Sequence, residues 1–226
     1  MARSSHLGVR RTPERVRPLA RSRTGVCELC TEAVAKADVR DHLTGCAPGH
    51  DSGHRQERLI QLEVEAAGAP EYWLYVEGRE SASLQQVDSV LRRTWLECCG
   101  HMSAFRVGRL EAAKRSPLGV VFRTKGLGFT YEYDFGSTTA LKGKVVGFRN
   151  GSIGRAAVRL IARNAPLPWA CEEKCGAQAV VVCPFCIHSG PSLFCKTHAP
   201  SHPCADEGVW LPVVNSPRMG VCGYTG

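Results

Sequence analysis

The chain has 226 residues with a formal net charge of +8, and 43% of them are hydrophobic, enough for one domain with appendages or for two domains. Its apolar runs stay well short of the roughly 18 residues of a membrane helix, so we expect no membrane span. Twelve cysteines without an apolar export segment lead us to expect a reducing compartment, the cytoplasm, with thiolates held by metal.

Positive charge is concentrated at the N-terminal end. Residues 1–25 show no hydrophobic periodicity, which predicts a disordered basic arm with seven arginines and one acid, Glu14. Such an arm can contact nucleic-acid phosphates or serve only as a solubilising tail. Beside Arg3, the candidate contacts are Arg10, Arg11, Arg15, Arg17, Arg21 and Arg23.

Residues 26–57 are expected to hold a small zinc finger and a turn-rich linker. The ligand spacing is Cys27-x2-Cys30-x11-His42-x3-Cys46, which resembles a C2HC finger. A helix predicted over about 33–43 would bring the last two ligands, four residues apart, onto one face. His50 or His54 could replace a ligand. The mixed charge of this helix favours a protein contact or simple stapling as much as base readout.

Residues 58–165 predict an α+β domain with a mixed or antiparallel sheet and one main helix. Apolar residues alternate over 60–64, and strand formers are dense over 72–76. A capping box of Ser83 and Gln86 precedes helically spaced Leu84, Val87, Leu91 and Trp95. Further strands are expected at 102–107, 119–123, 129–135, 141–149 and 156–162. A loop containing Asn150-Gly151 is expected to join the last two.

Several stretches of this domain resemble the plasmid pRi Orf-three-like family, over roughly residues 58–149. They are Trp73, the helix from Leu84 to Trp95, the run 101–105 and, most specifically, Tyr131-Glu-Tyr133-Asp-Phe-Gly. The family often includes transposon passenger proteins, and the resemblance implies a compact α+β domain without an established catalytic activity. Its members commonly continue with an acid, an aromatic residue and a histidine, whereas this chain has 137-Ser-Thr-Thr-Ala-Leu-141.

Residues 166–226 contain eight potential ligands within 34 residues, enough for two tetrahedral zinc sites. They are Cys171, Cys175, Cys183, Cys186, Cys195, His198, His202 and Cys204. In a cross-brace the first and third pairs would share one ion, and the second and fourth pairs the other. Sequential pairing is also compatible with the spacing. The ending Cys-x2-His, then His-x-Cys, resembles the AN-one-type double-zinc finger, which commonly binds protein.

The cysteines, and the pair His101 and Asp134, could also have redox, disulfide or catalytic roles. Cys183 and Cys186 could be a thioredoxin-like redox pair, but no helix is predicted after them. A disulfide framework would need an extracellular setting. Cys98 and Cys99 are interpreted as buried thiols, because adjacent cysteines on a helix point in different directions. An enzymatic site would bring Asp134 and His101 together in a pocket, and no zinc-deaminase motif is present.

Together these patterns predict about three structural Zn²⁺ ions, which with nine thiolates would lower the formal charge to about +5. The first hypothesis is a non-enzymatic adaptor that binds another macromolecule, most readily a protein. The second is a nucleic-acid-associated factor that uses the arginine-rich arm and the fingers. The third is an enzyme with a site around His101 and Asp134.

Overall fold

The computed structural model describes residues 24–53 and 56–226. Most of the predicted basic arm, including all seven of its arginines, lies outside the described residues. Within the described ranges, no helix has both the length and the apolar character needed to cross a membrane.

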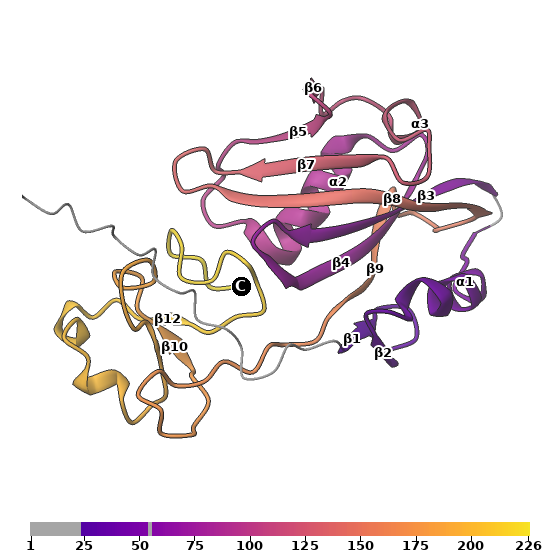
Figure 1. The fold of residues 1–226 in the computed structure, drawn as a ribbon. Helices are drawn as coiled ribbons and strands as arrows, with labels where there is room; N and C mark the ends of the chain where they lie inside the picture. The colour runs from indigo at the N-terminus through magenta and orange to yellow at the C-terminus, as the bar shows by residue number, and fades with distance from the viewer. Residues whose placement is uncertain (1–23, 54–55) are drawn as a thin grey trace, which may run out of the picture.

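A nine-stranded antiparallel sheet forms the centre of the molecule (Figure 1), which confirms the predicted α+β class. Its strand order is β2-β1-β9-β4-β3-β8-β7-β5-β6. The strands are β1 (Thr24–Cys27), β2 (Ala33–Ala35), β3 (Glu57–Ala66), β4 (Ala69–Arg79), β5 (Ser103–Val107), β6 (Leu110–Ala112), β7 (Gly128–Tyr133), β8 (Thr139–Gly151) and β9 (Val158–Asn164).

Helix α2 (Leu84–Leu91) and the π-helical turn η1 (Arg92–Leu96) cover one face of this sheet. The predicted capping box is present, because the Ser83 backbone N–H donates to Gln86 Oε1 over 2.9 Å. All four helically spaced apolar residues are buried in the main core, and Trp95 is among its largest fully buried side chains. Burial of such large side chains contributes on the order of 1.5–3 kcal/mol each.

The N-terminal module continues the sheet beyond β9 and covers part of its opposite face with a helix. It consists of the hairpin β1–β2 and helix α1 (Val39–Gly49), and β1 pairs with β9. Its apolar residues pack on the fully buried Trp73. The predicted helix over 33–43 therefore began too early: residues 33–35 form β2 instead, and the helix begins only after Asp38.

Two further predictions were wrong. Residues 119–123 are not a strand, because Pro117 precedes a short helix, α3 (Leu118–Val121), whose Leu118 is buried in the core. Asn150-Gly151 forms no loop between neighbouring strands. These residues extend β8 and pair with Glu57 and Arg58 of β3, while β9 lies beyond β4.

The C-terminal module has little regular structure. Its sheet has the order β11-β10-β12 and consists of β10 (Val181–Val182), β11 (Leu193–Phe194) and β12 (Leu211–Pro212). Two 3-10 turns complete it, η2 (Ala199–Ser201) and η3 (Ala205–Glu207). Trp169 stacks on Tyr72 of β4 with ring centroids 6.5 Å apart, so the module packs against the central core.

Candidate metal centres

The N-terminal cluster consists of Cys27, Cys30, His42 and Cys46, whose ligand atoms all lie within 4.8 Å of one another. The two cysteines of the knuckle lie at the turn of the β1–β2 hairpin, and the other two ligands are one helical turn apart on α1. The Sγ atoms of Cys27 and Cys46 are 3.8 Å apart, and Cys30 Sγ is 3.4 Å from His42 Nε2. His50 is not part of this group, and His54 lies outside the described residues.

The C-terminal module contains two clusters, and their ligands interleave along the chain. Cys171 and Cys175 meet Cys195 and His198, the first and third pairs of the motif. His198 Nδ1 lies 3.5 Å from Cys171 Sγ and 3.4 Å from Cys195 Sγ. This module therefore has the cross-braced arrangement and not the sequential one.

The second and fourth pairs, Cys183 with Cys186 and His202 with Cys204, form the other C-terminal cluster. Cys186 Sγ lies 3.4 Å from His202 Nε2 and 3.7 Å from Cys204 Sγ. Phe194 fixes the His202 ring from one side, with ring centroids 4.5 Å apart. The imidazole nitrogen lies within 4.8 Å of the sulfur atoms of the other three ligands.

These distances suit a tetrahedral ion. A Zn–S bond of about 2.3 Å gives sulfur–sulfur edges of about 3.8 Å, against about 2.05 Å for a disulfide. Sulfur pairs in the three clusters are 3.7–3.9 Å apart, and the cysteines are free thiols. Three sulfurs and one imidazole are the donor set of structural zinc sites.

The surroundings raise the pKa of some cluster thiols and lower that of others. Burial, together with hydrogen bonds from neighbouring thiols, raises the pKa of Cys46 and that of Cys186 to about 12. In contrast, a hydrogen bond from the His198 backbone N–H lowers the pKa of Cys195 to about 6. Several thiolates in one group repel one another, and a divalent cation between them removes that repulsion.

The structure also brings together a fourth group that the sequence interpretation missed. Cys98, Cys99, His101 and Cys222 place their ligand atoms within 4.8 Å of one another. The expectation that adjacent cysteines diverge assumed a helix, but η1 ends at Leu96 and the cysteines follow it in an irregular turn. Gly100, with a φ of +81°, then turns the chain so that His101 reaches the same point.

A signal for this group was present in the cysteine count. The three predicted clusters use nine of the twelve cysteines, which leaves Cys98, Cys99 and Cys222. What the sequence does not reveal is that residue 222 returns to residue 98, because no local pattern reports a contact over such a separation.

His101 and Asp134, the proposed enzymatic pair, also come close, with His101 Nε2 3.5 Å from Asp134 Oδ2. However, Asp134 is buried and accepts hydrogen bonds from Arg218 over 2.7 Å and from the backbone N–H groups of Gly136 and Ser137. The hydrogen bond from Arg218, followed by those backbone contacts, lowers the pKa of Asp134 to about 2. The carboxylate is therefore a firmly engaged structural anion.

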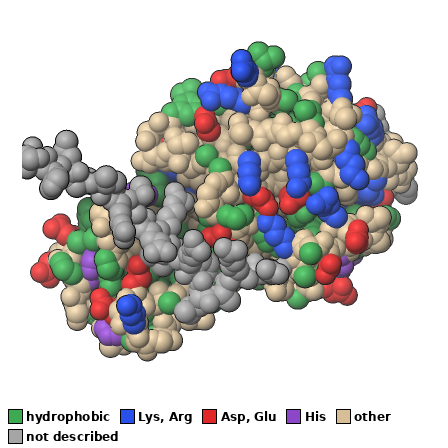
Figure 2. All heavy atoms as spheres, in the orientation of Figure 1, with side chains coloured by type: hydrophobic (Ala, Val, Ile, Leu, Met, Phe, Trp, Pro, Cys, Tyr) green, Lys and Arg blue, Asp and Glu red, His purple; other side chains and the backbone are tan. Residues whose placement is uncertain are grey.

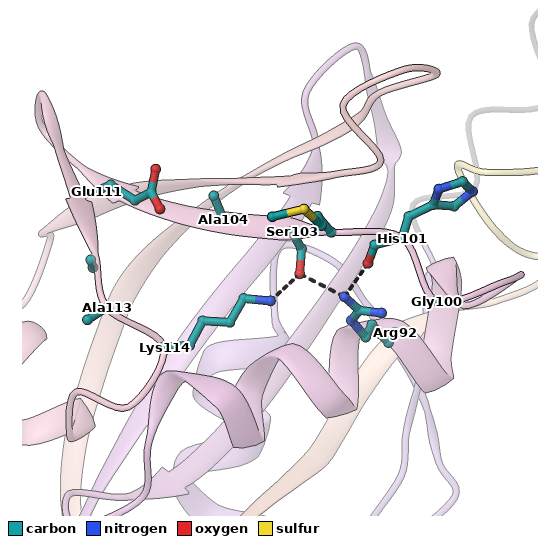
Figure 3. Close-up of a pocket in the computed structure, with 10 residues that line it drawn as sticks. Arg92, Gly100, His101, Ser103, Ala104, Glu111, Ala113 and Lys114 are labelled. Carbon is teal, nitrogen blue, oxygen red and sulfur yellow. Dashed lines mark hydrogen bonds between the residues drawn. The ribbon is translucent and has the colours of Figure 1, made fainter.

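A pocket of about 400 Å³ lies beside His101, but the imidazole is directed away from it (Figure 3). Polar groups of the pocket bond one another: Ser103 Oγ accepts from Lys114 over 2.5 Å and from Arg92 over 3.1 Å. The same hydroxyl donates to the buried Asp88 over 2.6 Å. The polar groups at the centre of the pocket thus form an internal network of matched charges.

No family model and no curated protein matches the chain. One solved structure that resembles it is a crystal structure of a protein of unknown function from Methanosarcina mazei Go1. The two are 16% identical, the match covers 47% of this chain and 69% of the other, and the TM-score is 0.41. A similarity at this level carries no functional argument.

Proposed function

We propose that the chain is a non-enzymatic, zinc-stabilised adaptor that binds another protein. The first support is the chemistry of the three predicted clusters. Each supplies four protein donors, which fill a tetrahedral shell and leave no position for a water molecule or a substrate. A catalytic zinc site would instead need an open coordination position.

The second support is the position of these clusters in the fold. The N-terminal cluster joins the β1–β2 hairpin, which continues the sheet, to α1, which covers part of one face. The C-terminal clusters stabilise a module whose own buried cluster is small, with Phe194 as its one buried aromatic residue. Structural zinc contributes about 10–16 kcal/mol of apparent binding free energy, which is enough to fold such a segment.

The observation that carries the adaptor function is an exposed apolar side chain at a metal knuckle. Phe185 lies between the ligands Cys183 and Cys186, and its relative exposure is 56%. Val209 of the same module is 48% exposed. A rigid knuckle that presents an aromatic residue to solvent has the character of a protein-contact anchor.

The test compares two equally drastic surface changes in the full chain. Phe185→Asp alters the knuckle, whereas Leu110→Asp alters an even more exposed apolar residue on β6, at 77%. Proteins cross-linked to the wild type in an extract of the source cells should be lost with F185D and kept with L110D. Zinc content should be equal in all three. A cross-linking pattern that is the same for both variants would refute the proposal.

A nucleic-acid-associated function is the alternative, and the described surface argues against it. Lysine and arginine side chains are prominent on one face of the molecule, but acids lie among them (Figure 2). Lys142 pairs with Glu65 over 3.3 Å, and Lys144 with Glu63 over 3.1 Å. The net positive charge of the chain is therefore concentrated in the arm. Nucleic-acid retention in filter binding that falls steeply with salt and disappears on deletion of residues 1–23 would favour this alternative.

Membership of the central domain in the plasmid pRi Orf-three-like family stays a proposal. The structure does say what the resembling residues do in this chain. Tyr131 donates to the buried Asp88 over 2.7 Å, and Tyr133 donates to Glu97 over 3.1 Å. Together with Asp134 they tie β7 to the helix and to the C-terminal tail. This motif therefore has a structural explanation that requires no catalysis.

A further inference from the structure

We propose that Cys98, Cys99, His101 and Cys222 bind a fourth Zn²⁺ ion, which fastens the C-terminal tail, residues 213–226, to the central domain. This inference concerns a site outside the predicted fingers. It does not depend on the identity of the partner protein, and it can fail while the three other sites stand.

The composition of the chain is the first argument. All twelve cysteines lie in described residues, and the four groups use each of them once. Each group combines three cysteines with one histidine. Twelve cysteines without a common role would not be expected to form four groups of identical donor composition with no cysteine left over.

The geometry is the second argument. Cys99 Sγ lies 3.7 Å from Cys98 Sγ, 3.7 Å from Cys222 Sγ and 3.0 Å from His101 Nε2. His101 Nε2 lies 3.2 Å from Cys222 Sγ. The sulfur–sulfur separations match the edge of about 3.8 Å of a tetrahedral site with Zn–S bonds of about 2.3 Å. The two sulfur–nitrogen separations are shorter than the edge of about 3.6 Å expected with a Zn–N bond of about 2.1 Å, so a bound ion would move the imidazole slightly outward.

The surroundings of the group are built as those of metal ligands usually are. The guanidinium of Arg218, itself fully buried, donates to Cys98 Sγ over 3.5 Å and stacks over the Tyr133 ring at 4.8 Å. Hydrogen bonds of this kind orient ligand side chains and moderate the charge of a site with three thiolates. Asp134 accepts from the same nitrogen of this guanidinium over 2.7 Å and balances its charge.

The backbone conformation of Cys222 is a further argument that its side chain binds a metal ion. Its φ is +51°, a conformation that non-glycine residues rarely adopt and that costs on the order of 1–3 kcal/mol. Such a conformation persists where the surroundings impose it. A metal bond to Cys222 would supply that constraint. The start of the tail is held separately, by the hydrogen bond that Ser216 donates to the Trp95 carbonyl over 2.6 Å.

Exposure distinguishes this site from the other three. Cys99 and Cys222 are exposed, and none of the four ligands is buried, whereas each of the other clusters contains at least one buried cysteine. A chelator therefore reaches this site most readily. We expect its ion to be removed first, with release of the tail.

Protection of the exposed thiols in the reduced, zinc-loaded full chain tests the site without any mutation. We expect about four zinc ions per chain by elemental analysis and slow alkylation of Cys99 and Cys222 by iodoacetamide. Alkylation of both should accelerate at least tenfold when a mild chelator has removed one ion. Rapid alkylation of Cys99 and Cys222 in protein that contains about three zinc ions would overturn the proposal.

Two variants assign the ion to these residues. His101→Ala and Cys222→Ser should each lower the zinc content by one and remove the first phase of chelator-induced release. His188→Ala is the matched control, because His188 belongs to no cluster in the described chain, and its zinc content should not change. Unchanged zinc content in H101A and C222S would contradict the assignment. Loss of every ion from both variants would contradict it as well, because the four residues would then support the whole fold and not hold one ion of their own.

Discussion

Glu77 offers the sharpest test of how the N-terminal segment is held on the sheet. Its side chain has 0% exposure and accepts from Arg149 over 2.6 and 2.9 Å and from Arg159 over 2.8 Å. Arg149 also donates to Asp51, just after α1, over 2.7 Å. One buried carboxylate thus fixes two arginines, and one of them holds the segment that follows the N-terminal module.

Glu77→Gln keeps the shape of the side chain and removes its charge. Loss of one partner of a buried ion pair costs about 3–5 kcal/mol, because the remaining charge is left uncompensated. Here Asp51 continues to pair with Arg149, and both arginines are partly exposed, at 14% and 17%. We therefore expect the free energy of unfolding to fall by about 2–4 kcal/mol at pH 7.

The effect should depend on pH in a definite direction. Burial raises the pKa of Glu77, but the hydrogen bonds from Arg149 and Arg159 outweigh it and hold this pKa below its ordinary value of 4.5. A carboxyl with a lowered folded-state pKa contributes its full stability above the unfolded-state value and loses it as the pH falls. The difference between wild type and E77Q should be constant from pH 8 to 6 and shrink below about pH 4.5.

Urea unfolding followed by tryptophan fluorescence, at a fixed free zinc concentration, measures this difference. The matched control is Glu132→Gln, because Glu132 forms a partly exposed pair with Arg106 over 3.4 Å and should matter by less than about 1 kcal/mol. Equal effects of E77Q and E132Q at pH 7 would refute the reasoning, as would a difference that grows on acidification.

Three further changes have equally definite outcomes. Gly25→Ala would place its Cβ 2.2 Å from Trp73 and should lower stability by about 1–3 kcal/mol in thermal unfolding, whereas Gly49→Ala, with open space around it, should not. Tyr131→Phe leaves Asp88 without one donor and should cost about 1–2 kcal/mol in the same assay, with unchanged zinc content. Complete zinc removal should abolish hydrogen-exchange protection in residues 170–212 while β3, β4 and β8 stay protected. The central strands and α2 supply most of the large apolar core, whereas the C-terminal module adds only a few residues to that core and has a small cluster of its own. Simultaneous loss of protection in both regions would contradict this.

The sequence predicts best where one local pattern suffices. The capping box and the spacing of Leu84 to Trp95 specify α2, and the alternation over 60–64 specifies β3. Local patterns failed where distant contacts decide. Residues 119–123 look like a strand, but Leu118 is drawn into the core as part of a short helix. Asn150-Gly151 looks like a hairpin turn, but β3 is long enough to pair with it.

The metal-ligand clusters were likewise predicted where the ligands are close in sequence and missed where distant contacts bring them together. Ligands within 20 residues of one another can be grouped from their spacing alone, as in the N-terminal cluster. Spacing left two pairings open in the C-terminal module, and the packing of β10 between β11 and β12 selects the interleaved one. Cys222 meets Cys99 only because the tail returns to the end of η1, and no short-range rule reports that return.

The pairing of β1 with β9 has a consequence for how the protein is made. Gly25 lies opposite Asn164, so about 140 further residues must leave the ribosome after Gly25 before the first hairpin can pair with the sheet. Until then the nascent chain exposes the face that contains Trp73. The N-terminal cluster is complete once residue 46 has emerged. A metal ion bound there would hold the β1–β2 hairpin and α1 together until β9 is available for pairing.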